Sequence, residues 1–230
     1  PEDNVEAVKK DNNDVSAVKS LVALFKNKYW IICIITVLTI NIMMILSGGS
    51  TIYFAEFVLK DVDLQATLNS VMNLALIPAA VVSIALMGKI GKRNMMLLGM
   101  GITLVSALIP LISLTPTVCI VSAALKGASF GMTGAPAGSI VQDAITYGLW
   151  KNGFSNIGMG NAANAFATKI GSSIGTILIG SLLEIGGFVS GAATQSSGAI
   201  SMISVLYIWV PAIISLINIV IMFFYDLDKF

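Results

Sequence analysis

Six long apolar segments recur along the chain, separated by short polar connections. Each segment is long enough to cross the hydrocarbon core of a bilayer, which takes about 20 residues of helix for roughly 30 Å. The pattern therefore predicts an all-α membrane protein with six transmembrane helices. We place them at about 29–57, 65–87, 95–113, 118–143, 157–184 and 203–225.

A polar stretch precedes the first apolar segment. Residues 1–28 carry five acids and five lysines and lack the short apolar core with a small-residue cleavage site that marks a signal peptide. Because this composition is typical of chain between two folded parts, we predict that residues 1–28 are a cytoplasmic inter-domain linker. Residues 29–230 are then a six-helix transmembrane domain, and another domain is expected before residue 1.

Positive charge is divided unevenly between the two sets of connections. An even number of spans places both ends of the domain on one side of the membrane, and loops rich in lysine and arginine stay in the cytoplasm. The opposite side holds Lys60 together with Asp61 and Asp63. The side of the ends holds Lys26, Lys28, Lys89, Lys92, Arg93, Lys151 and Lys229. The sequence thus predicts a multi-pass protein of the plasma membrane with both termini of the chain cytoplasmic.

The composition excludes several classes of function. Hydrophobic residues make up 56% of the chain, and the formal net charge of +1 is not the strongly basic balance of a nucleic-acid-binding protein. The chain has no histidine, which is the commonest general base and metal ligand. Cys33 and Cys119 lie inside apolar segments, where a thiol behaves as a small buried hydrophobe. We expect no nucleic-acid partner, no metal site, no cofactor and no catalytic residue, so the chain is not predicted to be an enzyme.

The fifth apolar segment is polar along one face. At about 100° per residue, Asn161, Asn164, Thr168, Lys169 and Ser172 fall in one half of the helix, and apolar side chains fill the other half. A seam of small residues beside this face would let a neighbouring helix approach closely: Ala167, Gly171 and Gly175. A polar face in a membrane span must look into protein or a cavity. We predict that its side chains bind the substrate.

Two lysines lie inside predicted spans. Lys169 is about twelve residues, or roughly 18 Å, from the cytoplasmic start of its helix, and a charge near the bilayer midplane commonly marks a substrate or ion path. The alternative is a structural ion pair with a carboxylate of another domain, because no acid of this chain is predicted at that depth. Lys126, about nine residues into the fourth span, could line the substrate cavity, snorkel to the outer surface or anchor packing beside Gly127.

Glycine and proline mark two other spans. Gly48 and Gly49 lie past the middle of the first span, and Pro78 lies in the second, where it is expected to interrupt the helix. Such residues are tolerated at membrane depth where neighbouring groups or a water-filled cavity satisfy the freed backbone. We predict that they are hinges of a gate. The alternative is that the glycines mark close packing of helices.

The stretch from Gln142 to Gly153 reads QDAITYGLWKNG. It resembles the Asp-Tyr-Gly-Glu-Trp-Lys-Thr-Gly signature between the tenth and eleventh helices of the glycoside-pentoside-hexuronide:cation symporters, the melibiose-permease-like branch of the major facilitator superfamily. Residues 53–59 are similar to the end of the seventh helix in that family, and residues 88–94 to its basic turn between the eighth and ninth helices. Lys169 stands where the eleventh helix of the family has a lysine. The resemblance covers essentially the whole chain.

The resemblance implies the C-terminal six-helix bundle of a twelve-helix transporter, which couples uptake of a sugar or glycoside to a cation, Na⁺ or H⁺, by alternating access. The sugar would bind near Lys169. The carboxylates that hold the cation would belong to an N-terminal six-helix domain of the same polypeptide. Asp143, Tyr147 and Lys151 would belong to a cytoplasmic gating network.

The chain departs from the family pattern at several positions. Thr146 and Leu149 stand where the signature has an aspartate and a glutamate, which implies a gating network with fewer charges. Gly134 stands where the melibiose permease has a sugar-facing tryptophan, and Ala165 replaces a polar residue one turn before Lys169. The identity of the substrate therefore does not carry over.

Two other functions are compatible with six spans. An exporter of drugs or other amphipathic solutes from the same superfamily would have the same helices around an apolar cavity, and the polar face of the fifth span argues against it. An anion channel could form if oligomerisation arranged the midplane lysines in a ring. A membrane enzyme would need paired carboxylates, a buried histidine or a metal motif, and the sequence offers none of these.

Overall fold

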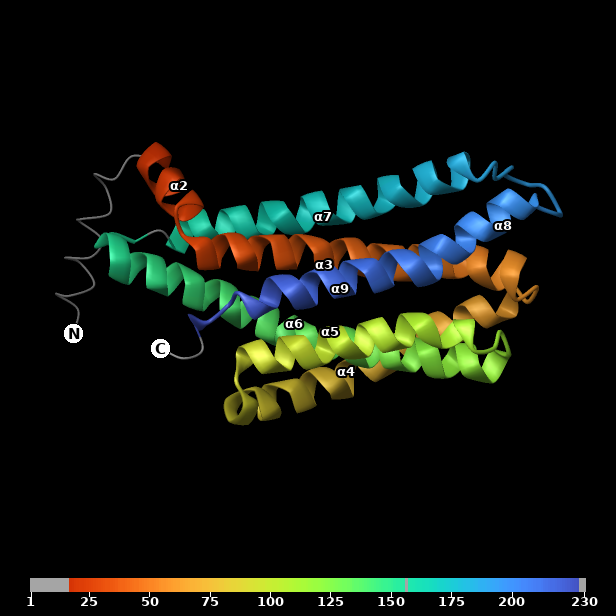
Figure 1. Ribbon diagram of the computed structural model, residues 1–230, viewed down its shortest axis with the longest axis horizontal. Coiled ribbons are helices and arrows are strands. Elements are labelled where there is room, and N and C mark those ends of the chain that lie inside the picture. The colour runs from red at the N-terminus through yellow and green to blue at the C-terminus, as the bar shows by residue number, and fades with distance from the viewer. Residues whose placement is uncertain (1–16, 156, 228–230) are drawn as a thin grey trace.

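The computed structural model describes residues 17–155 and 157–227, and this part of the chain is built from helices. Six helical segments in it are long and apolar enough to cross a membrane: 28–58, 63–90, 92–111, 116–152, 157–185 and 197–223. Figure 1 shows them running side by side along the long axis of the molecule. The prediction of an all-α, six-span fold is confirmed.

Three of the six spans contain a change of helix type. The elements are α2 (Ala17–Phe25), α3 (Lys28–Tyr53), η2 (Phe54–Val58), α4 (Asp63–Ile90), α5 (Lys92–Leu108), η3 (Ile109–Leu111), α6 (Pro116–Asn152), α7 (Ile157–Ile185), α8 (Ser197–Ser204), η4 (Val205–Trp209) and α9 (Val210–Phe223). The elements η2 and η4 are π-helical turns and η3 is a 3₁₀ turn. The first span is α3 with η2, the third is α5 with η3, and the sixth is α8, η4 and α9.

The helix ends follow from local chemistry. Asn27 caps α3, because its Oδ1 accepts hydrogen bonds from the backbone N–H groups of Tyr29 and Trp30. The Asn27 amide also donates to the carbonyl of Ala144 at 2.7 Å, which fixes the start of α3 against α6. Gly153 ends α6 in the left-handed conformation, with φ of 73°. We call the end of the bundle where α3 begins and α9 finishes the termini-side end.

The fourth span extends beyond its predicted end. The sequence-based end at residue 143 is wrong as a helix boundary, since α6 continues to Asn152 through the QDAITYGLWKNG motif. Ala144, Ile145 and Gly148 are buried on this extension, so packing sustains the helix beyond its most apolar part. The sixth span likewise begins at Ser197 rather than near residue 203. Within the predicted linker 1–28, residues 17–25 form α2, and residues 1–16 lie outside the described part.

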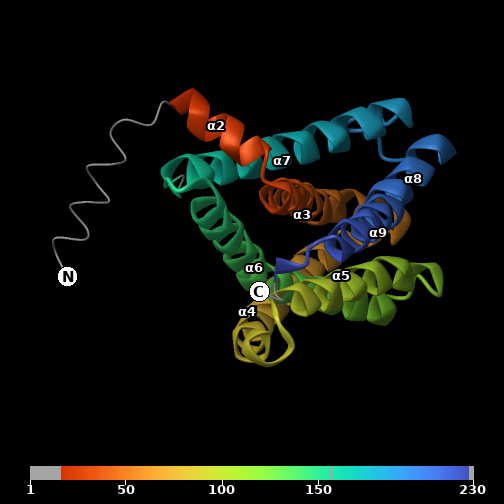
Figure 2. The same cartoon turned by 60° about the vertical axis from the view of Figure 1, so that its left-hand side comes forward.

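Small residues set the helix pairing. The helix α4 packs mainly against α6, and α7 packs mainly against α3, while α5 contacts α6 and α9 (Figure 2). A Cβ atom added at Gly171 would lie 2.5 Å from the carbonyl oxygen of Leu38, and one at Gly175 would lie 2.9 Å from Cβ of Ile45. The predicted small-residue seam is therefore the contact between α7 and α3. Gly127 makes the corresponding close approach to the backbone of α4 at Met72.

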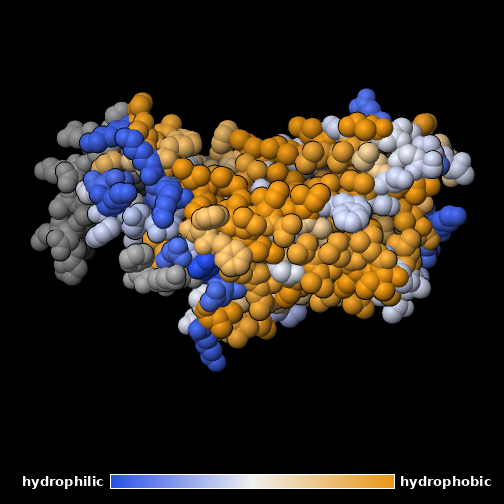
Figure 3. Space-filling model, in the orientation of Figure 1, coloured by the Kyte–Doolittle hydropathy of each residue, from blue (hydrophilic) through white to orange (hydrophobic). Residues whose placement is uncertain are grey.

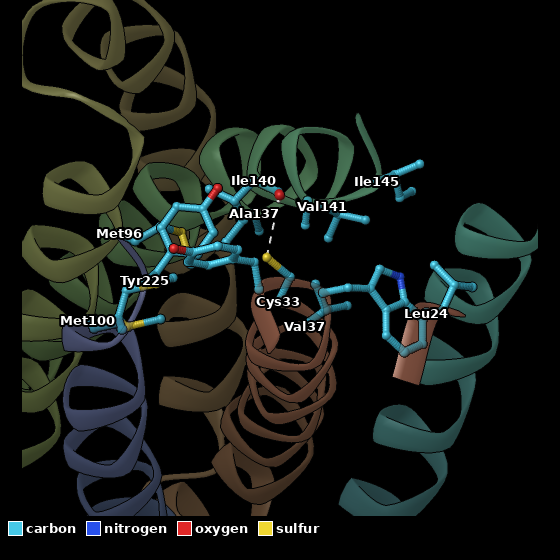
Figure 4. Packing of buried hydrophobic residues seen from close by; sticks show 14 residues of the cluster. Leu24, Cys33, Val37, Met96, Met100, Ala137, Ile140, Val141, Ile145 and Tyr225 are labelled. Carbon is cyan, nitrogen blue, oxygen red and sulfur yellow. Dashed lines mark hydrogen bonds between the residues drawn. The ribbon is translucent and has the colours of Figure 1, made fainter. Parts of the chain in front are cut away.

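Two apolar clusters fill the bundle, one near each end. The termini-side cluster surrounds Cys33, whose thiol lies 3.4 Å from the carbonyl oxygen of Ile140 (Figure 4). The other cluster includes Phe54, Leu206 and Tyr207. The outer surface is apolar over the middle of the bundle, with hydrophilic residues at both ends (Figure 3), as a membrane-spanning protein requires. Both cysteines are free and buried, which confirms their prediction as small buried hydrophobes.

The expected breaks at glycine and proline do not occur as helix breaks. The helix α4 runs unbroken from Asp63 to Ile90 with Pro78 inside it, and α3 runs through Gly48 and Gly49 to Tyr53. The prediction that Pro78 interrupts its helix is wrong, because helical backbone continues on both sides of the ring. A Cβ atom at Gly49 would meet Ile179 of α7 at 2.6 Å, so close packing accounts for this glycine. The first span changes type one turn later, at the π-turn η2.

Candidate functional site

A central cavity of about 350 Å³ lies between four helices near the middle of the bundle. Two amide side chains line it, Asn41 from α3 and Asn164 from α7. The remaining wall is apolar or glycine: Val37, Ile40, Met44, Leu76, Phe130, Gly134, Ala137 and Gly138. A mostly apolar cavity with a few converging polar groups is the usual form of a small-molecule site.

The two amides leave hydrogen-bonding capacity toward the cavity. The Asn41 side chain donates one hydrogen bond to the carbonyl of Val37 at 2.8 Å, which leaves its oxygen and a second N–H available. The side-chain oxygen of Asn164 is buried without a hydrogen-bond partner in the described part of the chain. A buried amide oxygen without a partner costs free energy unless a ligand or water donates to it. Asn164 is thus suited to a solute that carries hydroxyl groups.

The other polar residues of α7 continue this surface along the helix. Thr168 donates its hydroxyl hydrogen to the carbonyl of Asn164, and Ser172 donates to that of Thr168, each at 3.0 Å. Each hydroxyl oxygen keeps lone pairs that can accept from a solute. Asn161 lies further toward the termini-side end and accepts a 2.7 Å hydrogen bond from the side chain of Gln142 on α6. Of the predicted substrate-binding residues, Asn164 alone lines the central cavity.

Lys169 is exposed and faces away from α3. It lies two residues from Gly171, about 160° around the helix from the seam that contacts α3. Within the described part of the chain, its ammonium makes no hydrogen bond or ion pair. Its side chain therefore lies on a surface of α7 that the other described helices do not cover. We call this surface the open side of the bundle.

Lys126 is placed differently from the sequence-based expectation. It is 1% exposed, so the expectation that it could snorkel to the outer surface is wrong. Its Nζ donates to the backbone carbonyl of Tyr207 at 3.2 Å and lies 3.4 Å from the centroid of the Tyr207 ring. The residue does not line the central cavity. Of the predicted roles, the packing anchor is the one that its contacts support.

Residues of two π-helical turns lie around Lys126. Phe54 lies in η2 and Tyr207 in η4, and their rings stack with centroids 3.9 Å apart and planes 9° apart. A π-turn disturbs the regular helix hydrogen bonding, and the carbonyl of Tyr207 accepts from the lysine. Sequence reasoning missed Tyr207 and the two π-turns, because neither has a distinct residue pattern.

A larger cavity of about 830 Å³ lies at the termini-side end and contains an ion pair. Asp143 on α6 pairs with Lys92 on α5 at 2.5 Å. Tyr147 and Trp150 also line this cavity, whereas Lys151 is exposed and lies 5.9 Å from the Tyr147 ring centroid. The structure thus brings Asp143 together with the basic turn between α4 and α5. The sequence marks Lys92 only by its charge, because its partner Asp143 lies 51 residues away along the chain.

Comparison with known proteins assigns the chain to a family. The sequence profile of the family described as MFS/sugar transport protein matches residues 3–229. The chain belongs to this family. It is 30% identical over 214 residues to the isoprimeverose transporter of Lactiplantibacillus pentosus. The aligned region covers 91% of this chain and 44% of that protein. It is also 37% identical over 82 residues to the inner membrane symporter YicJ of Escherichia coli, covering 36% of this chain and 18% of that protein.

A third relative matches nearly the whole chain. The putative sulfoquinovose importer of Salmonella typhimurium is 21% identical over 230 residues, covering 95% of this chain and 46% of that protein. The chain spans about half the length of these long matches. The family and these relatives are transporters and symporters, which confirms the resemblance to the sugar:cation symporters and the prediction that this MFS/sugar transport protein is not an enzyme.

Proposed function

We propose that this chain is the C-terminal half of a transporter that carries a sugar or glycoside across the plasma membrane together with Na⁺ or H⁺. The observation that carries the proposal is the central cavity, where the amides of Asn41 and Asn164 face a mostly apolar wall. Sugars present both hydroxyl groups and apolar ring faces, so such a wall suits them. The family match supports sugar transport.

In this proposal the polar face of α7 forms one wall of the substrate path. Asn164 would accept a hydrogen bond from a sugar hydroxyl through its unpaired oxygen, with Asn161, Thr168 and Ser172 as further partners. Lys169 would complete the site from the open side of the bundle, where an N-terminal six-helix domain would face it. Lys126 is left out of the substrate site, because it is enclosed by protein.

The coupling cation would be held mainly by the N-terminal domain. None of the carboxylates in the described part of this chain lines the central cavity, and a cation site needs oxygen ligands, usually carboxylates. Alternating access would then arise from rocking of the two six-helix domains around a site between them. The half-length match to the relatives supports this division.

The termini-side cavity would belong to the gate. The Lys92–Asp143 ion pair would hold α5 to α6 in one state of the carrier, with Tyr147 and Lys151 contributing from α6. Gly48 and Pro78 would serve as hinges, whereas Gly49 packs against Ile179 of α7. The surplus of lysine and arginine at this end supports a cytoplasmic location for it.

The proposal is tested by sugar uptake in vesicles that contain the complete transporter. Uptake should rise when a Na⁺ or H⁺ gradient is imposed, and Lys169→Ala should abolish the coupled part while leaving the amount of inserted protein unchanged. Uptake that is indifferent to Na⁺, Li⁺ and H⁺ gradients would contradict symport. Normal coupled uptake by the variant would mean that Lys169 has a structural role and does not bind the substrate.

A matched pair of asparagines tests the cavity itself. Asn41 and Asn73 each donate a 2.8 Å hydrogen bond to the carbonyl four residues earlier, but Asn41 lines the central cavity and Asn73 is exposed on α4. Asn41→Leu should raise KM for the sugar by tenfold or more, about 1.4 kcal/mol of lost binding, whereas Asn73→Leu should transport normally. Equal effects of the two substitutions would remove the central cavity from the substrate path.

A further inference from the structure

The helix α2 has one buried face and one exposed face. Ser20 and Leu24 point into the bundle and are 8% and 1% exposed. Four other apolar residues remain exposed although they lie on an ordered helix: Val18 at 70%, Leu21 at 41%, Val22 at 46% and Phe25 at 61%. Their spacing of three and four residues places them in one stripe along α2. We call these four residues the outer stripe.

Lysines within and directly after α2 lie beside the outer stripe. At about 100° per residue, Lys19 and Lys26 fall together, roughly a quarter turn from the outer stripe and on the side away from Leu24. Lys28 follows at the start of α3. The ion pairs of the described residues include none with these three lysines, and Lys19 lies 5.2 Å from the ring centroid of Phe154. Such a helix, with an apolar stripe flanked by lysines, matches the pattern of helices that lie in a membrane surface.

The position of α2 fits that pattern. It contacts α3, α6 and α7 at the termini-side end of the bundle, and Figure 2 shows it lying against the start of α7. Phe25 meets Trp30 edge to face at 5.7 Å, so α2 ends at the level where the first span begins. Ile157 at the start of α7, a helix that α2 contacts, is another apolar residue at this end and is 48% exposed.

We propose that α2 is an interfacial helix whose outer stripe enters the lipid surface around the bundle, while Lys19, Lys26 and Lys28 bind anionic headgroups. The occupant is the bilayer because α2 packs against three of the membrane-spanning helices and ends at the level where the first span begins. The three lysines lie where the phosphates of the headgroups would be. This inference rests on the six spans and does not depend on sugar transport.

The native cysteines make the test direct. Cys33 and Cys119 are buried, so a nitroxide reagent would label a cysteine introduced on α2 selectively. The variants are Val22→Cys on the outer stripe, Lys26→Cys directly after α2 on its polar side, and Val220→Cys, exposed on α9, as the reference for a lipid-facing position. Each is reconstituted in vesicles of phosphatidylcholine, with or without one part in three of phosphatidylglycerol. Relaxation by oxygen, which partitions into lipid, is compared with relaxation by a water-soluble nickel complex.

The label at Val22 should respond several-fold more to oxygen than to nickel, as at Val220, and the label at Lys26 should respond more to nickel. Phosphatidylglycerol should deepen the Val22 label, and adding Lys19→Gln and Lys28→Gln should cancel that increase. A nickel-dominated response at Val22 in both vesicles would overturn the proposal. A weak response of Val22 to both reagents would also overturn it, because protein would then cover the outer stripe. Equal depth with and without phosphatidylglycerol would refute the role of the lysines.

Discussion

Lys126 and Lys169 are both lysines within apolar spans, and their surroundings are opposite. Lys126 is 1% exposed and bound to the carbonyl and ring of Tyr207. Lys169 is exposed on α7, without a side-chain partner in the described residues. Depth along a span therefore does not separate a lysine that is packed between helices from one that is exposed on the surface of the bundle. The groups within reach of the ammonium make that distinction.

The two sites differ in how the charge is compensated. An ammonium removed from water loses several kcal/mol of hydration, and at Lys126 a carbonyl dipole and a ring face at 3.4 Å offset part of that cost. At Lys169 the ammonium is exposed on α7, and no ion pair of the described residues compensates its charge. The first lysine is thus held in the packing of the helices, and the second has no such contact in the described residues and stays available for the proposed substrate site.

Reversal of charge gives the largest expected contrast between the two lysines. Lys126→Glu would place a carboxylate against the carbonyl and the ring face of Tyr207, and both repel negative charge. We expect a loss of about 3 kcal/mol or more in the free energy of unfolding. Lys169→Glu should change stability little, because its side chain is exposed. Thermal unfolding in detergent, followed by reaction of the buried Cys33 and Cys119 with a fluorogenic maleimide, measures both.

A neutral substitution at Lys126 separates the effect of charge from the effect of packing volume. Lys126→Met retains most of the volume and removes the charge, so it should lose much less stability than Lys126→Glu. If the two variants melt alike, packing volume rather than charge explains the site. If Lys169→Glu melts as early as Lys126→Glu, the contrast between the two lysines is wrong.

The two sides of α7 give a second, smaller contrast. Gly171 packs against α3, where an added Cβ would lie 2.5 Å from the carbonyl oxygen of Leu38, whereas Gly180 on the same helix has open space. Gly171→Ala should therefore cost about 1–3 kcal/mol through overpacking. Gly180→Ala should cost nothing, since alanine favours a helix over glycine. The same maleimide assay applies, and equal melting of the two variants would mean that α3 yields easily at the seam.

Much of the architecture was predictable because membrane spans impose a strong pattern. The apolar run of each span can be read directly, and the seam at Gly171 and Gly175 follows from a four-residue spacing that the structure uses against α3. The boundaries were less predictable. The helix α6 continues beyond its apolar run to Asn152, because contacts with α3 and the ion pair of Asp143 hold its last turns.

The candidate site was predictable only in part. Asn164 follows from the polar face of α7, but Asn41 is a single asparagine in an otherwise apolar stretch and gains meaning only from its position beside the same cavity. The partner of Lys126 lies 81 residues away in the sequence, at a π-turn that no residue pattern marks. Contacts of this kind depend on how helices pack, which a single sequence does not specify.

Loss of the Lys92–Asp143 ion pair should change stability least. Lys92 is a third cation, and its exposure is between that of the buried Lys126 and that of the exposed Lys169. The side chains of the pair are 30% and 35% exposed, so water and salt screen the attraction more than at a buried site. A double-mutant cycle with Lys92→Gln and Asp143→Asn should give a coupling of about 0.5–1 kcal/mol, and that coupling should shrink in high salt. A coupling above about 2 kcal/mol that salt does not change would show that the pair is enclosed as Lys126 is, and the ordering of the three cations by burial would fail.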